Sequence, residues 1–155
     1  TSALIRQLLE ARLKPRRLVL TVQREVAERI TASPNDMSLL ALSVQVYGKP
    51  VITGTIPAGA FFPAPNVDSA IVRTDLYPEP LIPFPQLPIF FRLAKAGFSQ
   101  KRKTLRNSLA GGLALPPQDV QNLLESAGID PKRRAETLTI EEWKQVVENY
   151  HRIGN

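Results

Sequence analysis

Apolar and polar residues follow patterns typical of an α/β unit in the first part of the chain. In residues 4–13 the leucines and the isoleucine recur at helical spacing, which predicts an amphipathic helix. Residues 18–22, LVLTV, form a continuous apolar run rich in β-branched side chains, as buried parallel strands do. Residues 24–32 return to helical spacing. The order of helix, strand and helix therefore predicts an α/β arrangement.

The next segments predict a helix and a pair of strands. Residues 38–48 fit both a helical and a strand pattern, and we favour the helix. Residues 49–56 and 68–76 have strand-like patterns and flank a proline-rich loop. Two strands joined by a stiff loop are expected to pair antiparallel at a sheet edge.

A proline-rich linker is expected to divide the chain. Residues 77–88 carry five prolines in twelve residues, which disfavours both a helix and a central strand. Beyond it the pattern is helical, and Thr139 and Glu142 have the spacing of a capping box. We therefore predict an α/β domain over residues 1–82 and a small all-α domain over residues 83–155, with Trp143 in its core. The helices are expected at residues 88–98, 102–110, 117–126 and 140–152.

Composition excludes several classes of protein. Hydrophobic residues make up 43% of the chain, and no apolar run approaches the roughly 20 residues that span a bilayer. The absence of cysteine excludes disulfides and cysteine-based zinc sites, and no other metal-ligand spacing stands out. These features predict a cytoplasmic protein that uses neither a membrane nor a metal.

The net charge of +6 is concentrated in one segment. Residues 87–118 contain six basic residues and no acidic one, whereas the charges on either side of this segment nearly cancel. Such a field attracts a polyanion, most often nucleic acid or an anionic membrane surface. The alternative is a helix face that is merely solvated. The six residues are Arg92, Lys95, Lys101, Arg102, Lys103 and Arg106.

The phrase FFPAPNVDS at residues 61–69 supplies the most specific motif. Its prolines restrict the backbone, so a neighbouring aromatic ring is held in place and could stack on a base. Alternatively, Phe61 and Phe62 are core residues beneath a loop. The phrase resembles the F-x-P-x-P-x-V-x-S motif of the ribosomal RNA adenine dimethyltransferases. In that family the first Phe, here Phe61, is implied to pack against the target adenine.

Three further phrases extend this resemblance over almost the whole chain. They are VQREVAERI at residues 22–30, FSQKRKTLRNSL at residues 98–109 and AGIDPKRRAETLTIEEW at residues 127–143. The resemblance implies the second half of a Rossmann-like methyltransferase domain, followed by a helical domain that binds small-subunit ribosomal RNA through the six basic residues. Asn66 departs from the family, where a basic residue is common. Lys132, Arg133 and Arg134 form a second cluster, for which pairing with nearby glutamates and RNA binding are both open.

The family's motifs for its methyl donor do not occur in this sequence. Neither the Gly-rich turn that holds S-adenosylmethionine nor the Asn/Asp-x-Pro-Tyr loop at the target amine is found. The resemblance thus implies part of an S-adenosylmethionine-dependent enzyme, and we expect the chain alone to be inactive. The alternative is a non-catalytic nucleic-acid-binding protein, comparable to the mitochondrial transcription factors that resemble this family.

Overall fold

The computed structural model describes residues 2–153, which form two compact units. Of the described residues, 2–32 and 40–80 belong to unit 1, and 33–39 and 81–153 belong to unit 2. The sequence-based boundary after residue 82 did not anticipate that residues 33–39 belong to unit 2. Backbone hydrogen bonds from Asn35 and Met37 to the carbonyl of Glu136 hold this segment there, with N···O distances of 2.9 and 3.3 Å.

Unit 1 is built on a sheet that has three strands within the described residues. They are β1 (Arg17–Gln23), β2 (Gly48–Ile56) and β3 (Ser69–Leu76), in the order β1-β3-β2. Both β1 and β2 run antiparallel to β3, and Arg73 of β3 is opposite Val19 and Val51. The pair of strands expected around the proline-rich loop is therefore confirmed.

The parallel pairing expected for residues 18–22 does not occur within the described residues. The neighbour of β1 in this sheet is the antiparallel β3, and burial alternates along β1. Val22 is buried on one face, whereas Val19 on the other is 59% exposed. The run is continuously apolar because both faces of β1 carry apolar side chains, although only one of them is covered.

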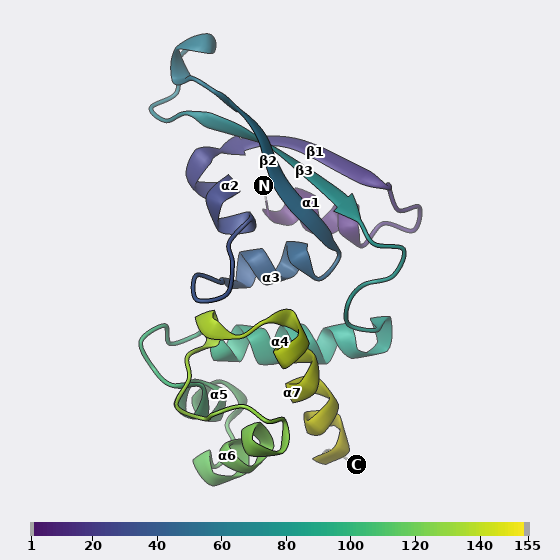
Figure 1. The fold of residues 1–155 in the computed structure, drawn as a ribbon, viewed down its shortest axis with the longest axis vertical. Coiled ribbons are helices and arrows are strands. Elements are labelled where there is room, and N and C mark those ends of the chain that lie inside the picture. Colours follow the sequence, from purple (N-terminus) through teal and green to yellow (C-terminus); the bar gives the residue numbers. More distant parts are fainter. Residues whose placement is uncertain (1, 154–155) are drawn as a thin grey trace. The chain divides into compact units, whose positions relative to one another are not determined.

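Helices cover one face of this sheet (Figure 1). They are α1 (Ser2–Leu9), α2 (Arg24–Ile30) and α3 (Leu39–Gln45), and α3 confirms the helix favoured for this ambiguous segment. The helices and the sheet both supply apolar side chains to the core, as helical and strand periodicity require. The buried residues include Ile5, Leu9, Ala27, Ile30, Leu42, Val44, Val22, Ala70 and Val72.

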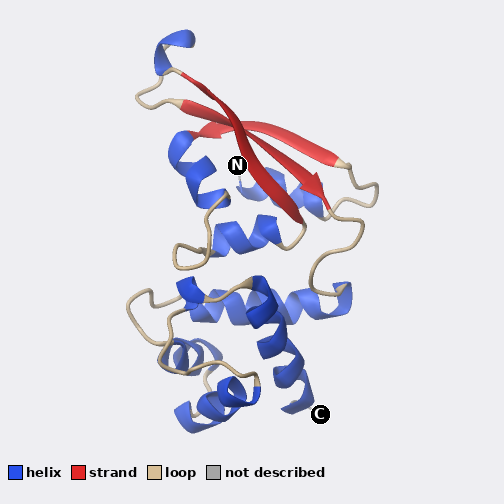
Figure 2. Cartoon of the chain, in the orientation of Figure 1, coloured by secondary structure: helices blue, strands red, loops and turns tan. Residues whose placement is uncertain are grey.

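Unit 2 consists of helices joined by loops (Figure 2). Its longer helices are α4 (Leu87–Gly97), α5 (Leu105–Leu113), α6 (Pro117–Ser126) and α7 (Ile140–Ile153). Trp143 is fully buried among apolar side chains from these helices, as expected. Short 3-10 helices occur at η2 (Phe84–Gln86) and η3 (Ala135–Thr137). No described helix combines the length and apolar character needed to cross a membrane.

The capping box expected for α7 is confirmed. The Oγ1 atom of Thr139 accepts a hydrogen bond from the backbone N–H of Glu142 at 3.1 Å. The Glu142 carboxylate in turn accepts from the backbone N–H of Thr139, also at 3.1 Å. This exchange satisfies two of the amides that a helix start leaves without partners.

Candidate functional site

The proline-rich segment between β2 and β3, residues 57–68, forms a loop with a hydrogen-bonded base, which we call the aromatic loop. It contains the 3-10 helix η1 (Ala58–Ala60). The Oδ1 atom of Asp68 accepts a hydrogen bond from the backbone N–H of Ala58 at 2.9 Å, which ties the two ends of the loop together. The carbonyl of Asp68 accepts from the backbone N–H of Arg24 at 3.0 Å. These bonds attach the loop to the start of α2.

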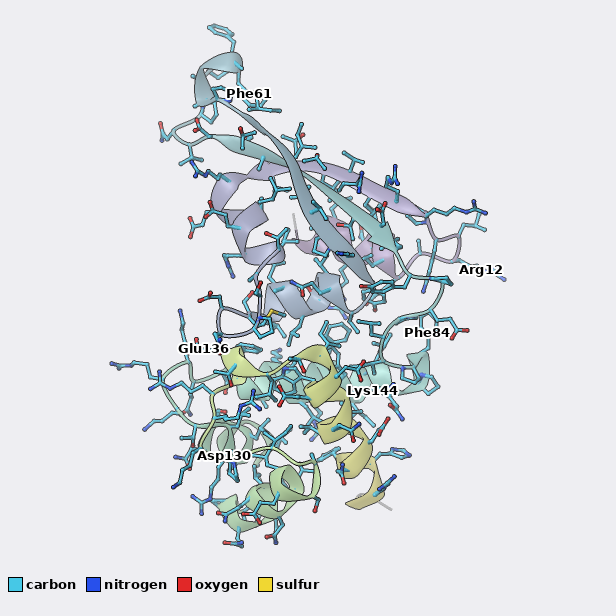
Figure 3. All side chains as sticks on the ribbon, in the orientation of Figure 1. Arg12, Phe61, Phe84, Asp130, Glu136 and Lys144 are labelled. Carbon is cyan, nitrogen blue, oxygen red and sulfur yellow. The ribbon has the colours of Figure 1, made fainter. Side chains whose placement is uncertain are left out.

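Both phenylalanines of the aromatic loop are exposed. Phe61 is 39% exposed and Phe62 is 102% exposed, so the alternative that they are core residues is wrong. Figure 3 places Phe61 at the tip of the β2–β3 hairpin. An aromatic ring that is held by the backbone yet open to solvent is available for contact with a partner.

The structure distributes the six basic residues over two helices and a turn. Arg92 and Lys95 lie on α4, and Arg106 lies on α5. We expected a helix from residue 102, but Lys101, Arg102 and Lys103 lie in the turn between α4 and α5. The reason is that Thr104 caps α5: its backbone is extended, with φ −66° and ψ 157°, and its Oγ1 atom accepts from the backbone N–H of Asn107 at 3.4 Å.

Among residues 2–153, no acidic side chain pairs with these basic side chains. Five of them are exposed and Arg106 is half-buried, and within the described residues none of the six forms an ion pair. The Nε atom of Arg106 is buried without a hydrogen-bond partner. We call the six residues the basic segment; it is a positive surface that no described carboxylate of unit 2 neutralises by direct contact.

In the second basic cluster, which consists of Lys132, Arg133 and Arg134, one residue forms an internal ion pair and the other two are exposed. Both Nη atoms of Arg133 bond the Glu142 carboxylate, and Nη2 also donates to the carbonyl of Thr137 at 2.8 Å. The hydrogen bond from Arg133 is the main cause of the lowered pKa of Glu142, and the same bond raises the pKa of Arg133. The pairing alternative is thus confirmed for Arg133, whereas Lys132 and Arg134 are exposed.

Backbone hydrogen bonds bring this cluster to the basic segment. The backbone N–H of Leu105 donates to the carbonyl of Arg133 at 2.7 Å, and that of Arg106 donates to the carbonyl of Pro131 at 3.2 Å. Residues 131–133 therefore lie against the start of α5, directly after the turn that carries Lys101, Arg102 and Lys103. Sequence reasoning missed this arrangement, because main-chain contacts between distant segments leave no residue pattern.

A cavity within unit 1 does not fit S-adenosylmethionine. It is lined by apolar side chains, among them Ile5, Leu18 and Val72, with Thr74 as its one polar residue. It offers no carboxylate for the ribose hydroxyls or the sulfonium charge of such a ligand. Among the described residues, no group of three or more acidic or histidine side chains could hold a metal ion.

Comparisons with known proteins agree with these observations. The chain is 50% identical over 150 residues to the ribosomal RNA small subunit methyltransferase A of Dehalococcoides mccartyi, covering 97% of this chain and 52% of that protein. It is 45% identical to the protein of the same name from Desulfitobacterium hafniense, covering 96% of this chain and 54% of that protein. The chain thus spans about half the length of these curated relatives.

A solved structure supports the fold. The crystal structure of a dimethyladenosine transferase from Plasmodium falciparum matches with a TM-score of 0.85 at 21% identity, covering 99% of this chain and 64% of that one. At this level of identity the likeness concerns the fold alone. The family model for ribosomal RNA adenine dimethylase matches residues 1–152. The chain therefore belongs to the ribosomal RNA adenine dimethylase family.

Proposed function

We propose that this chain is the RNA-handling part of an enzyme that transfers two methyl groups from S-adenosylmethionine to the exocyclic amine of an adenine in small-subunit ribosomal RNA. The observation that carries the proposal is the basic segment: six cations that form no ion pair within the described residues, in a chain of this family. A cytoplasmic location agrees with this role and stays a prediction.

The basic segment would hold the RNA backbone. Its exposed ammonium and guanidinium groups can replace the counterions that surround phosphates, and the release of those counterions drives binding. Such contacts fix the position of the RNA without reading its sequence. The basic segment alone would therefore position the RNA and leave the choice of base to other residues.

Phe61 would receive the target base. An adenine must leave its stack before its amine can be methylated, and this costs least in a single-stranded loop. Stacking on an aromatic ring offsets that loss by roughly 1 to 3 kcal/mol per base. The exposed ring of Phe61 is suited to this contact because the aromatic loop already restricts its backbone.

The methyl donor would be held outside this chain. When bound, S-adenosylmethionine supplies an electrophilic methyl group, and the apolar cavity of unit 1 offers this ligand no carboxylate. This chain's residues bind RNA and orient the base, and the chain alone is expected to be inactive.

A chimeric enzyme tests the proposal. This chain would replace the matching segment of the Dehalococcoides mccartyi relative, and transfer of labelled methyl groups to unmethylated small-subunit ribosomal RNA would be measured. We expect methylation by the chimera and none by either half alone. A folded chimera that binds both S-adenosylmethionine and RNA without transferring methyl groups would contradict the proposal and favour the non-catalytic alternative.

A further inference from the structure

Phe62 is the most exposed large apolar side chain among the described residues. It is 102% exposed, compared with 91% for Leu13 and 39% for its neighbour Phe61. A buried phenylalanine side chain typically stabilises a protein. Because the Phe62 ring is exposed, it contributes no such stabilisation to unit 1. Single exposed apolar residues are common, so exposure alone does not mark Phe62 as a contact, and the loop around it supplies the further evidence.

The backbone of the aromatic loop holds the Phe62 ring away from unit 1. The backbone N–H groups of Ala60 and Phe61 donate to the carbonyls of Pro57 and Ala58 at 3.0 and 3.2 Å. Pro63 follows Phe62 directly and fixes its own φ angle. A partner that contacts Phe62 therefore meets a ring whose backbone has little freedom left to lose.

Phe61 and Phe62 cannot serve the same face of one base. The backbone of Phe61 is extended, with φ −105° and ψ 152°. Consecutive side chains on extended backbone point to opposite sides. The two rings therefore form two separate surfaces, and a single target adenine occupies only one of them.

The loop offers a partner apolar and aromatic surface rather than charge. Residues 57–67 contain no charged side chain, and Asp68 is hydrogen-bonded to the backbone of Ala58. The loop has no cation to bind a phosphate group, whereas its two exposed rings can stack on the faces of unpaired bases. We infer that Phe62 is a second stacking surface, which takes the base next to the target adenine on the same single strand. This inference rests on the proposed function.

The test separates stacking from charge. Binding of the 155-residue chain to single-stranded oligo(rA) of about 12 nucleotides would be measured by fluorescence anisotropy at several salt concentrations. Phe62→Ala should weaken binding about tenfold at every salt concentration, because stacking releases no counterions. Phe62→Tyr should bind like the wild type, and Phe62→Leu should lose most of the contact. Leu13→Ala, which removes a similarly exposed side chain from unit 1, is the matched control.

Two further measurements test the geometry. A matched oligomer without bases should bind Phe62→Ala and the wild type equally. In a double-mutant cycle with Phe61→Ala, the two losses should multiply if the rings hold different bases. A double variant that binds no more weakly than Phe61→Ala would overturn the inference.

The outcomes also distinguish this inference from the proposed function. If the wild type binds oligo(rA) and Phe62→Ala binds equally well, the second stacking surface is refuted while the proposed function stands. If the wild type does not bind at low salt, both are refuted. Circular dichroism checks that each variant stays folded, which is expected because neither ring lies in the core.

Discussion

The turn between α4 and α5 allows a quantitative test of RNA binding. The perturbation replaces Lys101, Arg102 and Lys103 with glutamine, which removes three exposed charges. None of these side chains contributes to the core or forms an ion pair within the described residues. The helices that flank the turn are expected to remain intact, since Thr104 still caps α5. A change in RNA affinity can then be assigned to lost charge.

The size of the effect follows from counterion release. Each phosphate neutralised on single-stranded RNA contributes about −0.7 to the slope of log affinity against log salt. Three exposed cations therefore account for a slope change of about two. Between 50 and 200 mM salt, the ratio of wild-type to variant affinity should fall by roughly 20-fold. Arg106 is left in place because it is half-buried and its variant could disturb α5.

The assay is a salt titration with a matched control. RNA affinity would be measured by anisotropy over this salt range, with circular dichroism to monitor helicity. The control variant replaces Arg29, Lys49 and Arg152, three exposed basic residues elsewhere, with glutamine. It removes the same net charge, and its slope should stay close to that of the wild type.

Two results would refute this reasoning. An unchanged slope in the turn variant, with helicity intact, would assign Lys101, Arg102 and Lys103 to a solvated face. An equal reduction in the control would show that net charge rather than position determines binding. Either result would move the RNA contact away from the turn.

Three further predictions concern base stacking, packing and pH. In the chimeric enzyme, Phe61→Ala should lower methyl transfer strongly without lowering thermal stability, because the ring is exposed; an equal loss of both would contradict stacking. Gly112→Ala should lower the free energy of unfolding by about 1 to 3 kcal/mol, since the added carbon would lie 2.6 Å from the Cβ atom of Ala96. Gly111→Ala on the same helix meets nothing closer than 3.6 Å, so urea unfolding should show little loss or a slight gain. Because the pKa of Glu142 is lowered in the folded chain, its contribution is present above the unfolded value of about 4.3 and is lost as pH falls through the folded value. Urea unfolding should therefore lose stability more steeply below about pH 5 in the wild type than in Glu142→Gln, and parallel curves would refute the contribution.

Local patterns predicted the elements whose causes are themselves local. The capping box of Thr139 and Glu142 depends on residues three positions apart, and the structure contains both of its hydrogen bonds. The antiparallel pairing of β2 and β3 follows from two strand patterns that flank a proline-rich loop. The capping box joins residues three positions apart, and β2 and β3 are consecutive strands joined by one loop, so the order of residues along the chain carries the information in both cases.

Strand β1 shows where such patterns mislead. A continuous apolar run predicts burial on both faces, yet Val19 is largely exposed while Val22 is buried. Apolar residue type reports which side chains could be buried, whereas actual burial depends on which elements cover each face. The placement of residues 33–39 also depends on contacts that are distant in sequence, because hydrogen bonds to the carbonyl of Glu136 hold them in unit 2. Neither outcome follows from residues that are neighbours in the sequence.

The three consecutive cations at residues 132–134 show why the candidate site needed a structure. Their sequence context left ion pairing and RNA binding open for the whole cluster, and the structure divides it. Arg133 bonds Glu142, the same residue that caps α7, while its carbonyl accepts a hydrogen bond from the start of α5. The side chains of Lys132 and Arg134 remain exposed beside the turn that carries Lys101, Arg102 and Lys103. One internal ion pair thus fixes a loop whose two other cations add to the positive surface, so charge counted along the sequence cannot give the charge that the folded surface exposes.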